Sequence, residues 1–186
     1  MDALEMLQNR VSAPVLMEPA PTQEQLQEML KAARRAPDHD NLVPWRFLVI
    51  EGEARNELAK LYLKAGKAAN PDLPEEKEAK LLKMPLRAPT LLVAIATVHD
   101  HPKVPEVEQV ITAGCAAHAV VQAAYTMGLG AMWRTGEMAF NDTVKAGLGL
   151  KANEQIVGFI YLGSVKRFRT LEEESLDGLM TAWTGA

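Results

Sequence analysis

Three continuous apolar runs constrain the fold of this chain more than any other feature of its sequence. They occupy residues 47–50, 91–96 and 156–162, and short runs of this kind are typical of strands that are covered on both faces. The longer segments between them have helical patterns. Strands that alternate with helices predict one central mixed sheet flanked by helices, in an α/β or α+β fold.

The helices can be placed from their periodicity and their end signals. Residues 4–9 predict a short first helix that stops before Pro14. Thr22 can cap a second helix while Gln25 reaches back to it, and Pro37 ends that helix because a proline disfavours helical conformation in the residue before it. Further elements are expected at about residues 54–68, in the charged segment that ends at Pro85, at 106–127, and as a short strand at 131–134.

Length and composition favour one compact domain over residues 1–186. Hydrophobic residues make up 48% of the chain, and a chain of this length can bury most of its apolar surface. The formal net charge of -4 leaves no excess of Lys and Arg for a phosphate backbone, so nucleic acid is a poor candidate partner. The N-terminus lacks a signal segment, and no apolar run reaches the roughly 18 residues of a spanning helix. We therefore expect a cytoplasmic protein that makes no membrane contact.

The long helix expected at residues 106–127 is rich in small side chains. Residues 113–117 read Ala-Gly-Cys-Ala-Ala, and Ala119, Ala123 and Ala124 extend the pattern. Small side chains let helices approach closely, which fits tight packing in the protein's own core and fits equally well a helix that crosses its copy in a dimer. Residues 128–130, Gly-Leu-Gly, are expected to end the helix, because a dinucleotide-binding glycine motif follows a strand instead.

The common catalytic and metal-binding motifs do not occur in this sequence. It contains no Gly-x-Ser-x-Gly, no Walker phosphate loop and no His-Glu-x-x-His. His99 and His101 lie in a polar segment without a complete ligand set, which predicts a loop and no metal site. Cys115 and His118 share a helical face, but their small apolar neighbours indicate an inert, buried thiol instead of a nucleophile and its base.

The junction at residues 35–50 ends a helix, crosses a polar loop and enters a strand. A second helix end carries Arg10, beside Ser12. Guanidinium and hydroxyl groups at such ends can donate charge-assisted hydrogen bonds to a phosphate, so they favour a planar, anionic ligand beside the strand. The candidate side chains of the junction are Arg35, His39 and Asn41.

Four ordered motifs resemble the nitroreductase family, in its short bacterial branch. The similarity runs from Asp2 to about Gly163. It implies an α+β flavin fold, a homodimer with FMN sites at the subunit interface, and NADH or NADPH as the reductant. The motifs are Arg10-Val11-Ser12, the segment from Arg35 through His39 to Trp45, Ala113-Gly114, and Gly-Leu-Gly-Ala-Met-Trp-Arg-Thr-Gly at residues 128–136.

The resemblance assigns the FMN phosphate to the segment that follows the first helix. Arg10 and Ser12 would hold the phosphate, and Val11 would contribute only its backbone. Val11 stands where the family often has a second arginine, and residues 14–15, Pro-Val, replace another position that is commonly basic. We therefore expect a reduced affinity for the phosphate.

The flavin ring is assigned to two other segments by the same resemblance. Arg35 and His39 would contact the flavin from the same subunit as Arg10, and Asn41 would make a polar contact with the ring. The segment Trp133-Arg134-Thr135 would also reach the cofactor, so that one FMN draws on both chains. No catalytic side chain is expected, because a flavin performs the hydride chemistry and the protein supplies binding, orientation and electrostatics.

Two further features follow from the resemblance. Ala123, Ala124 and Gly128 match a segment that contacts NAD(P) in this branch, although their helical, apolar character fits core packing as well. Residues 164–186 leave the family pattern and would form a C-terminal arm that embraces the partner subunit, with Trp183 as an anchor. Lys166, Arg167 and Arg169 lie near the place of phosphate-binding bases in longer relatives.

The expected function is an FMN-dependent NAD(P)H oxidoreductase that reduces small nitroaromatic or quinone-like acceptors by a ping-pong hydride mechanism. One alternative on the same fold is a reductase or dehydrogenase for a single metabolite. Another is a module that stores or senses FMN without turnover.

Overall fold

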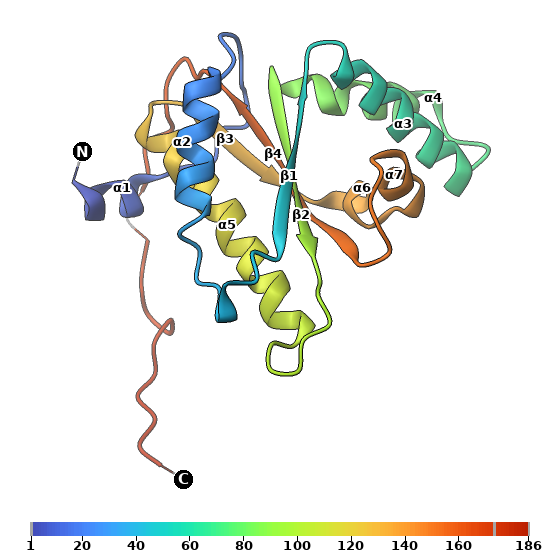
Figure 1. Cartoon of the computed structure of the whole chain (residues 1–186). Helices are drawn as coiled ribbons and strands as arrows, with labels where there is room; N and C mark the ends of the chain where they lie inside the picture. The colour runs from blue at the N-terminus through green and yellow to red at the C-terminus, as the bar shows by residue number, and fades with distance from the viewer. Residues whose placement is uncertain (1, 173, 186) are drawn as a thin grey trace.

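The computed structural model describes residues 2–172 and 174–185 and shows an α+β fold (Figure 1). Positions 1, 173 and 186 therefore lie outside the described residues: the first and last are the expected domain bounds, and the last two belong to the expected arm. Four strands form the sheet in the order β1-β2-β4-β3. They are β1 (Trp45–Glu51), β2 (Thr90–Thr97), β3 (Gly130–Arg134) and β4 (Glu154–Gly163).

The sheet is not mixed, because each of its three strand pairs is antiparallel. The connections from β1 to β2 and from β3 to β4 join antiparallel neighbours, so each of them begins and ends at the same end of the sheet. The α+β class is confirmed, and the expected mixture of strand directions is wrong.

Helices cover both faces of the sheet, and each face has its own core (Figure 1). Leu92, Ile160 and Leu162 point toward the layer that contains α2 and α5. Leu91, Val93 and Phe159 point toward the layer that contains α3, α6 and α7. The α-helices are α1 (Ala3–Asn9), α2 (Gln23–Ala33), α3 (Ala54–Ala69), α4 (Glu75–Lys83), α5 (Glu106–Thr126), α6 (Gly136–Phe140) and α7 (Asp142–Gly147), and two short 3-10 helices are η1 (His39–Asn41) and η2 (Met84–Arg87).

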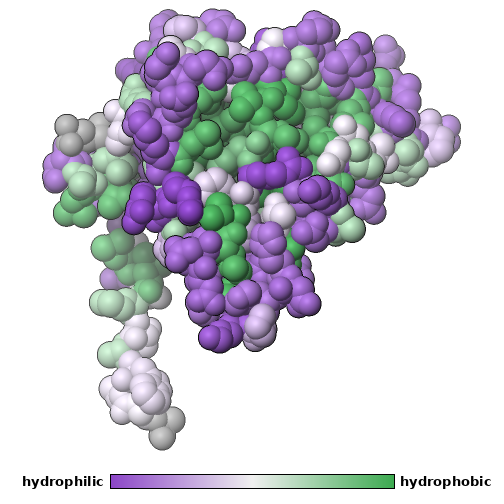
Figure 2. Space-filling model, in the orientation of Figure 1, coloured by the Kyte–Doolittle hydropathy of each residue, from purple (hydrophilic) through white to green (hydrophobic). Residues whose placement is uncertain are grey.

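The central strands are fully covered, whereas β1 is an edge strand. Residues 91–96 of β2 are all buried. On β1, Val49 is 51% exposed, and Trp45 and Phe47 are only half-buried beside Leu30 of α2. Figure 2 shows the resulting apolar area between the helical layers. The expectation that both faces of this strand are covered is therefore wrong for β1, although it holds for β2.

The helix ends follow the sequence signals. The Thr22 hydroxyl accepts a hydrogen bond from the Gln25 backbone N–H at 3.2 Å, and the Gln25 side chain accepts one from the Thr22 N–H at 2.9 Å. This reciprocal cap confirms the expected start of α2. Gly128 has a φ of 76°, a left-handed conformation that glycine adopts readily, and it ends α5 as expected.

The small residues of helix α5 lie on two faces, one buried and one partly exposed. Ala113, Ala116, Ala117 and Ala124 are buried in the core beneath α2 and the sheet. On the opposite face Val107 and Ile111 are 62% and 59% exposed, Gly114 and Cys115 are half-exposed, and His118 is exposed. Core packing thus accounts for one face of α5. On the other face α1 contacts the helix and shares a groove with Cys115 and His118, whereas Val107, Ile111 and Gly114 have no covering element among the described residues.

The C-terminal arm carries no helix or strand over residues 165–172 and 174–185. Phe168 makes an edge-to-face contact with Tyr125 at the end of α5, with ring centroids 5.0 Å apart. Beyond this contact the chain runs away from the body (Figure 1), and Trp183 is 88% exposed. Among the helices that the structure describes, none has the length and apolarity to cross a bilayer.

Candidate functional site

Residues 10–13 run beside the edge strand β3. The Ala13 N–H donates to the Ala131 carbonyl at 2.9 Å, which fixes this segment against the strand. Val11 is 5% exposed and anchors the segment, whereas Arg10 is half-buried and Ser12 is exposed. Two polar side chains are thus held at the sheet edge by one buried residue between them, although these positions lie far from β3 in the sequence.

A hollow of about 370 Å³ lies between this segment and the start of the arm. Arg10 and Arg169 both line it, and they bring two guanidinium groups to one place. The sequence named Arg169 only as a base near the expected phosphate region, and the structure places it opposite Arg10. The remaining lining residues are Gln8, Val11, Leu171, Glu172 and Glu174.

The end of β3 carries the second predicted segment. The Trp133 indole N–H donates to the Val157 carbonyl at 3.3 Å, and its ring packs on Gly158, where a Cβ would lie 2.0 Å from Nε1. The Arg134 guanidinium carbon lies 5.8 Å from the centroid of the Tyr161 ring. Thr135 is exposed, and its side chain makes no capping hydrogen bond to α6. Arg134 and Thr135 therefore remain available to a ligand, whereas the Trp133 indole N–H already has a partner.

Arg35 lies in the turn after α2 and lines a shallow groove of about 560 Å³ between α1, α2 and α5. Met6 of α1 lines the same groove, and so do Cys115 and His118 of α5. The expectation of a buried thiol is wrong, because Cys115 faces outward on α5 and is half-exposed.

The loop that carries His39 and Asn41 is held in an unusual conformation. Asp40, Asn41 and Val43 have φ values of 58°, 55° and 48°, a left-handed region that a β-branched residue such as valine rarely adopts. The Asp38 carboxylate stabilises this turn by accepting the backbone N–H groups of Leu42 and Val43, at 3.2 and 2.8 Å.

Two histidine–carboxylate pairs join this loop to the neighbouring segment at residues 99–108. His39 Nδ1 lies 3.0 Å from Glu108 Oε2, and His101 Nε2 lies 3.6 Å from Asp40 Oδ2. The hydrogen bond to Glu108 raises the pKa of His39 above its ordinary value. The predicted loop at 99–101 is confirmed, and no group of three or more metal-ligating side chains occurs among the residues that the structure describes.

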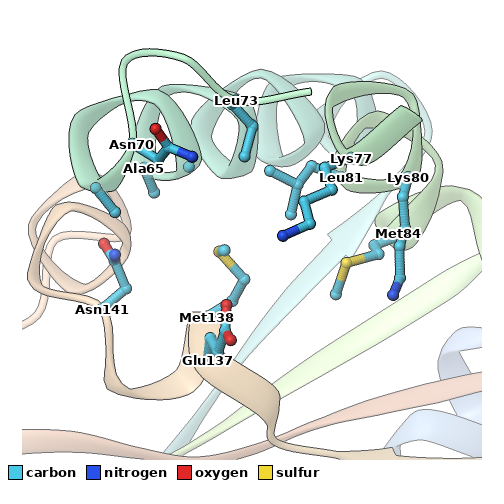
Figure 3. Close-up of a pocket in the computed structure, with 12 residues that line it drawn as sticks. Ala65, Asn70, Leu73, Lys77, Lys80, Leu81, Met84, Glu137, Met138 and Asn141 are labelled. Atoms are coloured by element: carbon cyan, nitrogen blue, oxygen red, sulfur yellow. The ribbon is translucent and has the colours of Figure 1, made fainter. Parts of the chain in front are cut away.

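A third cavity, of about 560 Å³, opens between α3, α4 and α6 (Figure 3). Glu137 and Met138 of α6, which follow Thr135 by two and three positions, form one wall. Lys77 and Lys80 extend from α4 on the other side. The sequence reasoning missed these residues, since charged positions on a helix are usually solvated and nothing local shows that α3 and α4 enclose a cavity.

The residues predicted to contact NAD(P) differ in accessibility. Ala124 is fully buried in the core, so no ligand can reach its side chain. Ala123 is half-buried and lines the groove beside Arg35, and Gly128 is exposed. Core packing thus explains Ala124, and only Ala123 and Gly128 remain accessible.

The predicted residues form two groups in the chain. Arg10, Val11 and Ser12 lie beside β3, whose end carries residues 133–135. Arg35, His39 and Asn41 lie on the connection from α2 to β1. The groove at Arg35 and the hollow at Arg10 share no lining residue.

Comparison with known proteins gives one consistent family. A sequence model of the nitroreductase family matches residues 14–164. YdjA of Escherichia coli K12, provisionally named an NAD(P)H nitroreductase, is 43% identical over 164 residues, which is 88% of this chain and 88% of that protein. A Haemophilus influenzae protein with the same provisional name is 36% identical over 165 residues, covering 88% of this chain and 89% of the relative.

Solved structures show the same fold. A nitroreductase-like family protein from Bacillus cereus aligns with a TM-score of 0.83 and 23% identity, over 100% of this chain and 97% of that one. A nitroreductase with bound FMN from Bacteroides fragilis aligns with a TM-score of 0.71 and 21% identity, over 97% of each chain.

Proposed function

This chain belongs to the nitroreductase family, and from that premise we propose that it is an FMN-dependent oxidoreductase that takes electrons from NADH or NADPH. Its acceptors are nitroaromatic or quinone-like small molecules. The observation that carries the proposal is the pairing of Arg10 and Arg169 at one hollow beside the sheet edge. Two guanidinium groups at one small hollow suit a phosphate, which each of them can bind through two parallel hydrogen bonds.

The residues around this hollow fit the phosphate end of FMN. Ser12 adds an exposed hydroxyl, and the buried side chain of Val11 holds the backbone of the segment in place. Glu172 and Glu174 of the arm line the same hollow. Their carboxylates would repel a bound phosphate, which is consistent with a reduced phosphate affinity.

The ring end of FMN fits the segment at the end of β3. Arg134 and Thr135 offer a guanidinium and a hydroxyl there, and Trp133 contributes packing through its ring. When it is bound, FMN supplies the hydride chemistry, and the chain binds and orients it. Positive charge from Arg134 beside the ring would stabilise a reduced, anionic flavin.

The site is completed by a second copy of the chain in a homodimer. Arg35 and His39 would contact the flavin from the same subunit as Arg10, and the remaining ring contacts would come from the partner. The uncovered face of α5 supports this assembly, because Val107 and Ile111 are more than half exposed on it. Its half-exposed Gly114 would allow close helix approach.

Anaerobic mixing of the purified protein with NADH or NADPH tests this function. We expect a yellow protein whose flavin absorbance bleaches with one of the two nucleotides and returns when a nitroaromatic acceptor is added. Parallel lines in double-reciprocal plots would support the ping-pong order. A colourless preparation that refuses added FMN would overturn the proposal.

Two outcomes would favour the alternatives. Flavin that binds but stays oxidised with both nucleotides would indicate a storage or sensing module. Turnover limited to a single metabolite would indicate a dedicated reductase, and a steady-state comparison of several acceptors measures that selectivity.

A further inference from the structure

The cavity between α3, α4 and α6 places opposite charges on facing walls. Lys77 and Lys80 come from α4, and Glu137 comes from the first turn of α6 (Figure 3). Gly136 has a φ of 60°, and this left-handed residue turns the chain from β3 into α6 just before Glu137. The amide side chains of Asn70 and Asn141 also line the cavity.

These three charges have no protein partners in the described part of the chain. No ion pair within 4.0 Å involves Lys77, Lys80 or Glu137 there, although other charges on the same helices are paired. Lys67 of α3 and Glu78 of α4 form such a pair, at 2.9 Å, outside the cavity lining. The cavity therefore keeps two ammonium groups and one carboxylate that are free to bind a ligand.

Between the charged groups the walls are apolar. Leu73, Leu81 and Met84 line one side, and Met138, which is 6% exposed, lies beneath them. A volume of about 560 Å³ lies within the range of small-molecule sites, which are apolar clefts with a few placed polar groups. The lining thus suits a flat or aliphatic body that carries one charged end.

We propose that this cavity binds monoanionic acids with an apolar, reducible body, such as nitroaromatic monocarboxylates, and selects them as acceptors. The inference deepens the proposed function and rests on it, because Glu137 of the cavity wall follows Thr135 of the segment assigned to the flavin ring by two positions. Lys77 and Lys80 bind the carboxylate, and Glu137 opposes a second negative charge on the ligand. The order of preference is monoanion, then neutral molecule, then dianion.

The experiment compares 4-nitrobenzoate, 4-nitrobenzamide and 4-nitrophthalate, which carry one, no and two negative charges on similar bodies. Ligand-observed NMR titration of the protein as purified gives the three dissociation constants, and steady-state reduction gives the three KM values. We expect 4-nitrobenzoate to bind most tightly, and its advantage over the amide to shrink as salt is raised. Equal affinity for the acid and the amide would overturn the proposal.

Substitutions of the two lysines test whether they bind the carboxylate of the ligand. We expect Lys77→Gln and Lys80→Gln each to raise the dissociation constant of 4-nitrobenzoate about threefold, and the double variant about tenfold, as for partly exposed ion pairs. The constant for 4-nitrobenzamide should stay unchanged. Lys64→Gln is the matched control, because Lys64 is an exposed lysine of α3 that does not line the cavity. A similar loss in the control, or no loss in the double variant, would contradict the assignment.

Glu137 supplies the opposite test. We expect Glu137→Gln to tighten binding of 4-nitrophthalate more than that of 4-nitrobenzoate, and the reverse order would count against the proposal. Flavin absorbance of each variant separates the two levels of inference. If the protein fails to hold FMN, the proposed function fails, whereas the NMR titrations still decide whether the cavity selects monoanions.

Discussion

Arg46 on β1 and Glu154 on β4 form a two-pronged ion pair that spans the intervening strand β2. Arg46 Nε lies 2.6 Å from Oε1 of Glu154, and Nη2 lies 2.8 Å from Oε2. The carboxylate also accepts hydrogen bonds from the Thr97 hydroxyl at 3.2 Å and the Lys151 N–H at 2.9 Å. The Glu154 side chain is only 2% exposed, so this pair ties the edge strand to the middle of the sheet.

We expect Glu154→Gln to lower the free energy of unfolding by about 2 to 3 kcal/mol near neutral pH. The neutral amide leaves the Arg46 charge without its partner at a partly buried position. The hydrogen bonds from Arg46 lower the pKa of Glu154 to about 2, so the carboxylate stabilises the fold above its unfolded pKa and this contribution is lost as the pH falls toward 2. The difference between the wild type and the variant should therefore shrink between about pH 4.5 and pH 2.

Urea denaturation at several pH values measures this difference. Glu57→Gln is the control, because Glu57 pairs with Lys60 on the surface of α3 and both side chains are more than 60% exposed. Exposed pairs of this kind contribute about 0.5 kcal/mol. If Glu154→Gln and Glu57→Gln lowered the free energy of unfolding equally, or if the loss in Glu154→Gln stayed unchanged at low pH, the stabilising role of the Arg46–Glu154 pair would be contradicted.

Sequence patterns predicted most helices and strands correctly, but they did not predict how the strands are placed in the sheet. The apolar runs and the Thr22 cap placed strands and helix starts because each depends on local periodicity or on a bond within a few residues. The run at 47–50 looks as apolar as the run at 91–96, yet only the second lies in the centre of the sheet. Position in a sheet depends on long-range pairing, which a local pattern does not contain.

The site was predicted only where the resemblance supplied long-range information. Nothing in the local pattern joins residues 10–12 to β3, and the Ala13–Ala131 hydrogen bond that does so links distant parts of the chain. The place of Arg169 could not be predicted, because no helix or strand follows β4 in the described part of the chain. Lys77 and Lys80 had the pattern of an ordinary solvated helix face and are exposed, and only the packing of α3 on α4 brings them to the edge of a cavity.

The buried hydroxyl of Tyr62 has no hydrogen-bond partner among the described residues. Its ring packs edge-to-face on Phe159, with centroids 5.7 Å apart, and burial raises the pKa of this phenol. We expect Tyr62→Phe to raise the free energy of unfolding by about 1 kcal/mol, because it removes an unsatisfied polar atom and keeps the ring. Tyr62→Leu, which loses the ring contact, should lower it in the same denaturation assay. A destabilised Tyr62→Phe would show that the hydroxyl has a partner.

Proton binding by His39 should control the loop that carries Asn41. The pKa of His39 is raised by its hydrogen bond to Glu108, so the pair stabilises the folded loop below the unfolded pKa near 6.5, and this contribution is lost as the pH rises through the folded value. The neighbouring charges are Asp40, which supports the protonated form, and Lys103, which opposes it. NMR titration of the imidazole should show Glu108→Gln lowering the pKa of His39. An unchanged pKa would mean that the pair does not form in solution.

The phosphate assignment predicts selective losses of FMN affinity. We expect Arg10→Ala and Arg169→Ala each to weaken FMN binding by about 1 to 3 kcal/mol, the size of a charged hydrogen bond. Arg35→Ala should weaken it as well, because Arg35 would contact the flavin from the same subunit as Arg10. Arg34→Ala is the control, because Arg34 is exposed in the turn next to Arg35 and lines none of the cavities described. Fluorescence quenching of FMN on titration with apoprotein measures all four constants. Equal affinities across the series would place the phosphate elsewhere.

A substitution at Gly114, on the uncovered face of α5, distinguishes a monomer from a dimer that packs through this helix. In the isolated chain a Cβ at this position meets nothing within 4 Å, so helix propensity alone predicts that Gly114→Ala stabilises the protein by about 1 kcal/mol. In a dimer that crosses at this face, the added methyl group would push the two helices apart. We therefore expect Gly114→Ala to raise the dimer dissociation constant in sedimentation equilibrium while stability measured at high dilution stays the same or increases. An unchanged dimer dissociation constant in Gly114→Ala would show that the two copies pack through another surface, because small residues are needed only where backbones approach closely.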